Sequence, residues 1–401
     1  MRVAVLFRRF GPYHYARLSA ARGVVEAVGI ELSQVDTVYD WEPSPPPDGC
    51  SLVSVLKTSP ELISFKEIRR GVWKALDKAR PEVVAIPGWS GRWVLAAWVW
   101  CVRNGLPIIL MSESTPWDAP RIPLIEKLKA RIVKSAGAEL VGGRPHQEYL
   151  KRLGMREGHI YFGYDVVDNQ HFATRADAAR ARRDETRRAL GLPQRYFLAS
   201  GRFIAKKNFD RLMEAYARYR VALGEGAWRL VILGDGRLRN RLEGRLRSLG
   251  LGGYVYLPGF KQYSQLPAYY GLAQAFIHSS AVEQWGLVVN EAMAAGLPVL
   301  VSERCGCAPD LVEEGRNGFT FDPYDVEALA GLMVRLSSMS DQQRQPMGQA
   351  SREIISRWTP QTFAENLVKA VEAALEAPPP KARLSDKALL WALAHRPRAK
   401  E

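Results

Sequence analysis

Short runs of apolar residues alternate with longer amphipathic stretches along almost the whole chain, and this alternation most constrains the fold. The apolar runs lie at 2–7, 83–87, 107–111, 138–143, 196–201, 229–234, 254–259, 274–280 and 298–302. Helical patterns in the first half lie at 13–28, 66–79, 91–104 and 123–135. Continuous apolar runs are typical of parallel strands that are buried on both faces. We therefore predict a doubly wound α/β fold.

A chain of 401 residues is longer than a domain with a single hydrophobic core usually is, so two domains are expected. The segment 168–190 is rich in Arg and Ala and indicates the domain boundary. We predict an N-terminal domain over residues 1–170 and a second domain over 188–358. A helix over about 360–377 and a basic tail over 378–401 are expected to complete the chain.

Several features favour a cytoplasmic protein. The four cysteines are few and irregularly spaced, which favours a reducing compartment over a disulfide framework. No apolar run reaches the roughly 18–20 residues that span a bilayer. Arg8 and Arg9 interrupt the first apolar run, so it does not read as a signal peptide.

The net charge of +14 implies a polyanionic partner such as a phosphate-bearing substrate, an anionic membrane or nucleic acid. The excess is spread over residues 121–134, 175–188 and 381–401, with no single recognition helix. On the predicted helix 123–135, Ile125, Leu128 and Ile132 share one face, and the basic residues around that face are Lys127, Lys129, Arg131 and Lys134. That pattern fits a helix at a membrane surface and equally a solvated basic face.

The stretch "EQWGLVVNEAMAAG" (283–296) predicts a helix that begins near Gly286 and ends before Gly296. The N–H groups at such a helix start form an anion site, and a glycine lets a ligand approach the backbone. Glu291, about one turn inside, could accept hydrogen bonds from both hydroxyls of a vicinal diol. Glu283, in the preceding loop, is predicted to face the same pocket from the other side. Taken alone, two such carboxylates are more typical of a solvated surface.

A second stretch, "SGRFIAKKNFDRLMEAY" (200–216), changes that balance. Arg202 and Lys207 follow the predicted strand 196–200 at its carboxyl end, where doubly wound sheets bind ligands. Arg202 offers a bidentate guanidinium and Lys207 a point charge, so both could bind one diphosphate.

Together, "SGRFIAKKN", "VILGDGRLRNRLE" and the stretch 254–302 resemble the retaining glycosyltransferases of family 4. The similarity is closest over about 195–325 and looser in the first 170 residues. It implies the GT-B architecture, with two facing Rossmann-like domains and a C-terminal helix that returns to the N-terminal domain. It also implies retaining sugar transfer from a nucleotide-diphosphate sugar to a glycan or lipid-linked acceptor, in cell-surface polysaccharide or glycolipid biosynthesis.

The resemblance assigns roles to residues in the second half. Arg202 and Lys207 would bind the donor diphosphate, Glu291 the nucleotide ribose and Glu283 the transferred sugar, so that Arg202, Lys207 and Glu283 form the catalytic set. The remaining donor-binding candidates are Gly286, Leu287, Val288, Phe260 and Lys261.

Candidates on the acceptor side are fewer. Gly11 and His14 follow the first strand, where the family has a glycine-containing loop that is often richer in glycine. Glu113 follows the strand 107–111, in a region where the family often has a histidine. His14 could orient the acceptor or act as a base, and a packed or surface histidine is an equally good interpretation.

No metal or other cofactor is expected. The chain has no Asp-x-Asp motif, and Cys305 and Cys307 lack a second Cys/His pair to complete four ligands. "GDG" (234–236) is expected to be a strand-to-helix turn. The tryptophans at 93, 98 and 100 are more typical of packing than of a base-stacking platform.

Two alternatives remain open from the sequence. A nucleotide-sugar epimerase or a sugar phosphorylase would use the same architecture, although no Schiff-base lysine for a pyridoxal phosphorylase stands out. A basic nucleic-acid-binding protein is a non-enzymatic alternative, and the scattered charge weighs against it. The partners we expect are a nucleotide sugar, its acceptor and an anionic membrane at its inner face, without nucleic acid.

Overall fold

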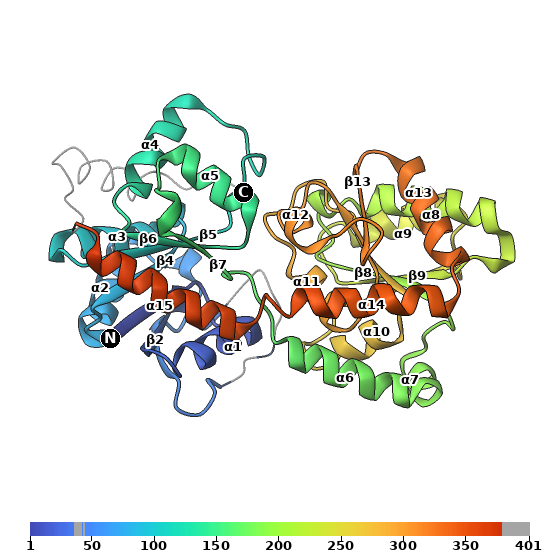
Figure 1. The fold of residues 1–401 in the computed structure, drawn as a ribbon, viewed down its shortest axis with the longest axis horizontal. Coiled ribbons are helices and arrows are strands. Elements are labelled where there is room, and N and C mark those ends of the chain that lie inside the picture. The colour runs from blue at the N-terminus through green and yellow to red at the C-terminus, as the bar shows by residue number, and fades with distance from the viewer. Residues whose placement is uncertain (36–41, 43–44, 379–401) are drawn as a thin grey trace. The chain divides into compact units, whose positions relative to one another are not determined.

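The computed structural model describes residues 1–35, 42 and 45–378 and forms two compact units (Figure 1). The first unit comprises residues 1–166 and the chain from Pro360 onward, and the second comprises residues 167–359. Residues 379–401, most of the predicted basic tail, lie outside the described residues. None of the helices in the described ranges is long and apolar enough to cross a membrane.

The first unit contains a parallel seven-stranded sheet in the order β3-β2-β1-β4-β5-β6-β7. Its strands are β1 (Arg2–Phe7), β2 (Glu26–Ser33), β3 (Ser51–Leu56), β4 (Val83–Pro87), β5 (Ile108–Ser112), β6 (Ala138–Val141) and β7 (Ile160–Phe162). Its α-helices are α1 (Pro12–Ala21), α2 (Phe65–Ala79), α3 (Arg92–Asn104), α4 (Pro123–Val133), α5 (Arg144–Leu153) and α15 (Pro360–Glu376).

The second unit contains a parallel six-stranded sheet in the order β10-β9-β8-β11-β12-β13. Its strands are β8 (Tyr196–Ser200), β9 (Arg229–Leu233), β10 (Val255–Gly259), β11 (Ala275–His278), β12 (Val299–Ser302) and β13 (Gly318–Phe321). Its α-helices are α6 (Asn169–Ala181), α7 (Arg183–Leu190), α8 (Phe209–Leu223), α9 (Arg239–Ser248), α10 (Leu266–Leu272), α11 (Leu287–Ala294), α12 (Ala308–Leu311), α13 (Val326–Ser338) and α14 (Asp341–Ile355). In both sheets the strand order reverses beside the first strand of the unit, as in Rossmann folds.

The helical pattern predicted over 13–28 is wrong in its second half. Helix α1 ends at Ala21, and residues 26–28 belong to β2, which pairs with β1 in the register Val3↔Ala27. The segment 27–32 is buried beside β1, and this tertiary pairing outweighs the local helical periodicity. Strands β3, β7 and β13 were also not predicted, because each is short or only half-buried.

The segment 168–190 forms α6 and α7 within the second unit. Asp168 caps α6 by accepting a hydrogen bond from the backbone N–H of His171 at 2.9 Å. The Asn169 amide donates to the carbonyls of Ile355 and Trp358 at 2.9 and 3.1 Å, which joins the start of α6 to the end of α14.

Helix α15 packs beside α1 in the first unit, as the predicted fold class requires (Figure 1). Arg17 of α1 donates to the Tyr164 carbonyl at 2.6 Å, and its guanidinium lies 4.8 Å from the Phe7 ring centre and 5.9 Å from that of Phe363 on α15. This buried cation therefore links α1, the first strand and the returning helix.

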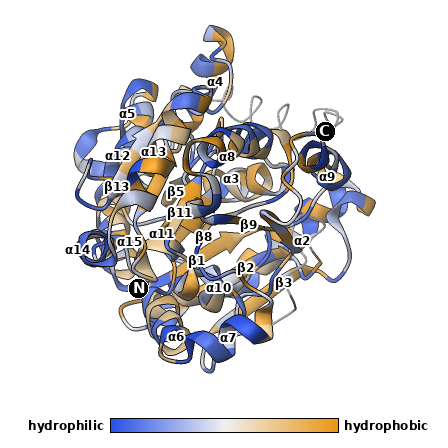
Figure 2. Ribbon diagram, turned by 90° about the vertical axis from the view of Figure 1, so that its right-hand side faces the viewer, coloured by the Kyte–Doolittle hydropathy of each residue, from blue (hydrophilic) through white to orange (hydrophobic). Residues whose placement is uncertain are grey.

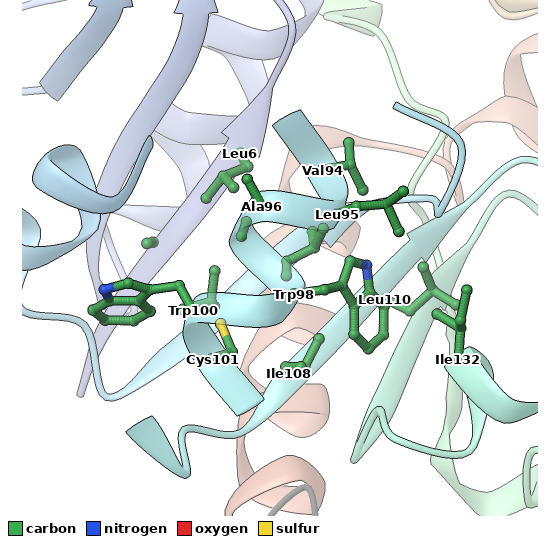
Figure 3. Packing of buried hydrophobic residues seen from close by; sticks show 14 of the residues in the cluster. Leu6, Val94, Leu95, Ala96, Trp98, Trp100, Cys101, Ile108, Leu110 and Ile132 are labelled. Atoms are coloured by element: carbon green, nitrogen blue, oxygen red, sulfur yellow. The ribbon is translucent and has the colours of Figure 1, made fainter. Parts of the chain in front are cut away.

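Helix α3 supplies much of the core of the first unit (Figure 3). Trp98 and Trp100 are buried there, as their interpretation as packing residues predicts. Each indole N–H has an acceptor: the Gly88 carbonyl at 3.2 Å for Trp98 and Asp77 Oδ1 at 2.9 Å for Trp100. Figure 2 shows the apolar colouring concentrated on the strands, whereas α7 is mostly polar.

One carboxyl group lies inside this core. Glu139 of β6 is fully buried, and neither of its carboxyl oxygens has a hydrogen-bond partner. Its neighbours in register are Leu110 of β5 and Ile160 of β7, both members of the core. Burial raises the pKa of Glu139 well above its ordinary value and so favours its protonated form.

We expect this carboxyl to make folding stability depend on pH. Its folded-state pKa is raised, so its contribution is fully present below the ordinary pKa of 4.5 and is lost as the pH rises through the folded-state pKa. Between pH 4.5 and the folded-state pKa, the free energy of unfolding should fall by up to about 1.4 kcal/mol per pH unit on account of this group.

Denaturant unfolding at a series of pH values measures this pH dependence. Glu139→Gln should flatten the dependence, whereas Glu148→Gln, on the exposed side of α5, should leave it unchanged. Equal pH dependence in wild type and Glu139→Gln would contradict the assignment.

Candidate functional site

The predicted site residues of the second unit lie at the point where the strand order reverses. Strands β8 and β11 are neighbours, and each is followed at its carboxyl end by a loop. The loops are joined by hydrogen bonds from the Ala281 N–H to the Lys206 carbonyl at 2.8 Å and from Ser279 Oγ to the Lys207 carbonyl at 3.1 Å. Parallel α/β sheets bind their ligands at such reversal points.

Asn208 holds the first of these loops in place. It adopts a left-handed backbone conformation (φ = 60°) at the start of α8, and its side chain is buried. The side-chain amide donates to the carbonyls of Ser279 at 3.1 Å and Pro323 at 2.8 Å. These two bonds fix the turn that carries Lys207 beside the end of β11.

Lys207 and Glu283 form an ion pair between the two loops. Both side chains are largely buried, with 12% of each exposed. Ser280 Oγ donates to Glu283 Oε2 at 3.2 Å, and Lys206 Nζ lies 3.8 Å from Oε1. Burial alone would raise the pKa of Glu283, but the Lys207 charge and His278 outweigh it and hold the pKa well below its ordinary range.

His278 is a site residue that the sequence reasoning missed. It ends β11, is 2% exposed, and its Nε2 lies 3.4 Å from both Glu283 Oε2 and Ser280 Oγ. Burial lowers the pKa of His278; the contact with Glu283 opposes this shift and the Lys207 charge reinforces it. The imidazole is therefore neutral near pH 7. The available signal was a polar residue at the end of an otherwise apolar strand, "AFIH".

Gly286 begins α11 at φ = 110°, a conformation that favours glycine. A β-carbon at this position would lie 3.2 Å from His278 Nε2 and 3.6 Å from Cys307 Sγ. The backbone at Gly286 thus passes close to the imidazole, and the N–H groups of Leu287 and Val288 in the first turn have no acceptor within the helix. The predicted helix start at Gly286 is confirmed, and the anion site at it stays a prediction.

Glu291 lies one turn further along α11 and is 1% exposed. Its Oε2 accepts a hydrogen bond from the hydroxyl of Tyr270 on α10 at 2.7 Å. Burial and the neighbouring carboxylate raise the pKa of Tyr270 well above its ordinary value, so the tyrosine remains a donor. Glu291 is thus a buried, oriented carboxylate and not the solvated surface charge that an isolated glutamate suggests.

The other donor-side candidates lie at the same edge of the sheet. Arg202 is half-buried in the loop after β8, and Phe260 and Lys261 follow β10. The "GDG" segment forms the turn between β9 and α9. A β-carbon on Gly234 would lie 2.0 Å from the Gly201 carbonyl oxygen, so this glycine permits the close approach of the two loops.

The acceptor-side candidates lie in the first unit. Gly11 precedes α1 and its N–H donates to His14 Nδ1 at 3.2 Å. Burial, followed by the Arg17 charge, lowers the pKa of His14 well below its ordinary value. Its ring centre lies 4.3 Å from that of Phe7. His14 is therefore a neutral, packed histidine.

Glu113 follows β5, and its charge reaches Tyr164, which stacks on the same Phe7 ring at 6.3 Å. The pKa of Tyr164 is raised by burial and then by Glu113. Tyr164 therefore relates to both candidates: its ring stacks on Phe7, which contacts His14, and its pKa responds to the charge of Glu113. Within the described residues, no group of three or more His, Cys, Asp or Glu has the geometry of a metal site, and Cys305 and Cys307 are buried thiols.

Comparisons with known proteins bear on this arrangement. Residues 182–354 match the model of the family described as glycosyl transferases group 1. Alpha-D-kanosaminyltransferase of Streptomyces kanamyceticus is 31% identical over 332 residues, which cover 70% of this chain and 84% of that protein. The chain belongs to the glycosyl transferases group 1.

Other members match over shorter regions. The GDP-mannose-dependent alpha-(1-6)-phosphatidylinositol monomannoside mannosyltransferase of Mycolicibacterium smegmatis is 30% identical over 221 residues, or 53% of this chain and 56% of that protein. For the first two curated relatives, the matched region spans only 41% and 24% of their length. The similarity to these proteins is therefore concentrated in part of their chains.

The solved structure of Anabaena Alr3699/HepE in complex with UDP and glucose has the same fold. It superimposes with a TM-score of 0.72 at 16% identity and covers 93% of this chain and 99% of that one. The predicted fold class, the GT-B architecture of two Rossmann-like parallel-sheet domains, is confirmed.

We expect Gly286→Ala to destabilise the protein. The left-handed backbone and the contacts with His278 and Cys307 leave little room for a methyl group, and a cost on the order of 1–3 kcal/mol follows. Gly331→Ala is the matched control, because a β-carbon at this exposed position inside α13 meets nothing within 4 Å. The control should stabilise by up to about 1 kcal/mol. Thermal unfolding compares the two, and a Gly286→Ala midpoint at or above that of wild type would refute the argument.

Proposed function

We propose that the protein is a metal-independent retaining glycosyltransferase that uses a nucleoside-diphosphate sugar as donor. The observation that carries the proposal is the ion pair of Lys207 and Glu283 at the strand reversal, beside the start of α11 at Gly286. A cation, a helix N-terminus and a buried carboxylate are thereby gathered at one sheet edge. The Anabaena structure in complex with UDP and glucose supports a donor of this class.

The chemistry of transfer requires stabilisation of the leaving diphosphate. Breaking the sugar–phosphate bond places negative charge on the phosphate oxygens. Lys207 and Arg202 would hold that charge together with the N–H groups of Leu287 and Val288. These donors are fixed before the reaction, because the loops that carry them are joined to each other and anchored by Asn208. A preorganised cationic site of this kind can act without a metal ion.

Glu283 serves in this scheme as a hydrogen-bond acceptor for the transferred sugar. Its depressed pKa keeps it ionised at neutral pH, so it would not donate a proton to the leaving group. In a front-face mechanism that retains the anomeric configuration, the departing phosphate takes the proton of the acceptor hydroxyl. Glu291, oriented by Tyr270, would hold the two ribose hydroxyls, with Phe260 and Lys261 near the base.

The acceptor is proposed to be a glycan or a lipid-linked sugar, in the synthesis of a cell-surface polysaccharide or glycolipid. The relative from Mycolicibacterium smegmatis, named for a phosphatidylinositol mannoside, supports a lipid-linked acceptor. Gly11, His14 and Glu113 would lie on the acceptor side. We further propose that the protein works at an anionic membrane surface, which its net charge of +14 favours.

Substitutions in the donor site test the assignment. We expect Lys207→Ala and Glu291→Ala each to lower the transfer rate by roughly 10²–10³-fold, because each removes a preorganised donor-binding group. Lys206→Ala is the matched control, since Lys206 is more exposed and lies farther from Glu283 than Lys207 does. Transfer from a panel of nucleotide sugars is measured together with circular dichroism. Wild-type rates in a folded Lys207→Ala or Glu291→Ala protein would sink the assignment.

The stereochemistry of the product tests the mechanism separately. A retaining enzyme gives a glycosidic bond with the anomeric configuration of the donor. Proton NMR of the anomeric signal of the newly formed glycoside distinguishes the two outcomes. An inverted linkage would rule out the front-face mechanism.

A further inference from the structure

The imidazole of His278 contacts the proposed donor site but takes no part in the transfer scheme. It is buried at the end of β11, and its Nε2 lies 3.4 Å from both Glu283 Oε2 and Ser280 Oγ. The Gly286 backbone confines the ring, because a β-carbon there would lie 3.2 Å from Nε2 and 3.4 Å from Cδ2. The ring of Phe276, two residues earlier on the strand, lies within 14° of parallel to the imidazole. The ring is therefore held with Nε2 beside the Glu283 carboxylate.

The contact with Glu283 decides which ring nitrogen of His278 carries the hydrogen. The pKa of Glu283 lies well below its ordinary range although burial opposes this, so the carboxylate is ionised and both its oxygens are acceptors. Burial lowers the pKa of His278, so the ring is neutral near pH 7 and one nitrogen alone carries a hydrogen. An unprotonated Nε2 would place its lone pair against a carboxylate oxygen, whereas an Nε2–H donates to it. The geometry therefore requires the Nε2–H tautomer.

The two oxygens of Glu283 are held unequally. Oε2 has three donors, which are the Lys207 ammonium, the Ser280 hydroxyl at 3.2 Å and His278 Nε2 at 3.4 Å. Among the described residues, Oε1 has only the Lys206 ammonium, at 3.8 Å. Donors on two loops and a strand thus fix the orientation of the carboxylate through one oxygen and leave the other for a substrate hydroxyl.

We propose that His278 is a positioning residue for sugar transfer, which fixes the Glu283 carboxylate so that Oε1 accepts from a hydroxyl of the transferred sugar. The imidazole contacts the carboxylate rather than the sugar, so it acts through Glu283. A neutral donor suits this position, because a third cation beside Lys206 and Lys207 would be disfavoured by both burial and repulsion. The inference rests on the proposed function, from which the role of Glu283 comes.

The transfer rates of two His278 variants test the role. His278→Leu keeps the bulk but has no donor, and it should lower kcat by roughly 10–100-fold, as expected for a lost hydrogen bond to a charged group. His278→Gln has an amide N–H that can reach the same oxygen and should recover most of the rate. Equal kcat in wild type and a folded His278→Leu protein would overturn the proposal, as would a glutamine variant no faster than the leucine variant.

His159→Leu is the matched control for the loss of an imidazole hydrogen bond. His159 lies in the first unit, just before β7, and its Nδ1 is 2.7 Å from the Gly137 carbonyl oxygen. Its removal should leave kcat unchanged. A drop in kcat as large as that of His278→Leu would mean that any such loss slows the protein, and it would overturn the proposal.

Nucleoside diphosphates separate positioning of the sugar from general damage to the site. Protection against thermal unfolding by UDP or GDP alone should be equal in wild type and His278→Leu, because neither ligand contains the sugar. Protection by the corresponding nucleotide sugar should be weaker in the variant. Equal weakening for both kinds of ligand would assign His278 a structural role and overturn the proposal.

A double-mutant cycle tests whether His278 acts through Glu283. Glu283→Gln by itself should lower kcat. Adding His278→Leu should then change kcat by less than about twofold, because the carboxylate that the imidazole positions is already absent. Losses that multiply would mean that His278 acts independently of Glu283 and would overturn the proposal.

NMR of ¹⁵N-histidine-labelled protein tests the contact without any substrate. The signals that disappear in His278→Gln belong to His278, and at pH 7 they should report a neutral ring with its hydrogen on Nε2. An Nδ1–H tautomer or a cationic ring would refute the proposal. A wild type that transfers no sugar would refute the proposed function and this role with it, whereas an active wild type with an equally active His278→Leu protein would refute the inference alone.

Discussion

The ion pair between Lys207 and Glu283 is the interaction on which the proposed donor site depends. It lies in a largely buried position, where an unpaired carboxylate or ammonium would be costly, so each partner requires the other. The pair also explains why the surroundings are polar: Ser280 and His278 provide further contacts to the same carboxylate. Two loops that are 76 residues apart in sequence are thereby fixed at one sheet edge.

The backbone around this pair adopts conformations that are unfavourable elsewhere. Asn208 and Gly286 both have positive φ angles, and each begins a helix at the site. At Asn208 two side-chain hydrogen bonds compensate for the conformation, and at Gly286 the missing side chain avoids His278. Such backbone conformations, in loops supported by a well-packed sheet, are typical of a preorganised site.

The sequence predicted most of the buried strands, the loops that carry Lys207 and Glu283, and the helix that carries Glu291, because these depend on local patterns. Apolar runs identify β8 and β11, and the residues that follow them must lie at the carboxyl edge of the sheet. The contact between Lys207 and Glu283 depends on which strands are neighbours, so no direct contact between the two was predicted. Strand β2 and His278 were missed because they too depend on tertiary structure. Pairing with β1 makes residues 26–33 a strand, and burial beside Glu283 makes His278 part of the site.

Binding of the donor to the free protein is the most direct test of the central claim. A panel of UDP and GDP sugars, in buffer that contains a chelator of divalent metals, is scored for protection against thermal unfolding. A ligand that binds only the folded state stabilises it by about 2.7 kcal/mol at 100 times its Kd. At least one nucleotide sugar should raise the unfolding midpoint of wild type and not that of Lys207→Ala. Equal protection of both proteins, or protection that requires added metal, would contradict the proposed site.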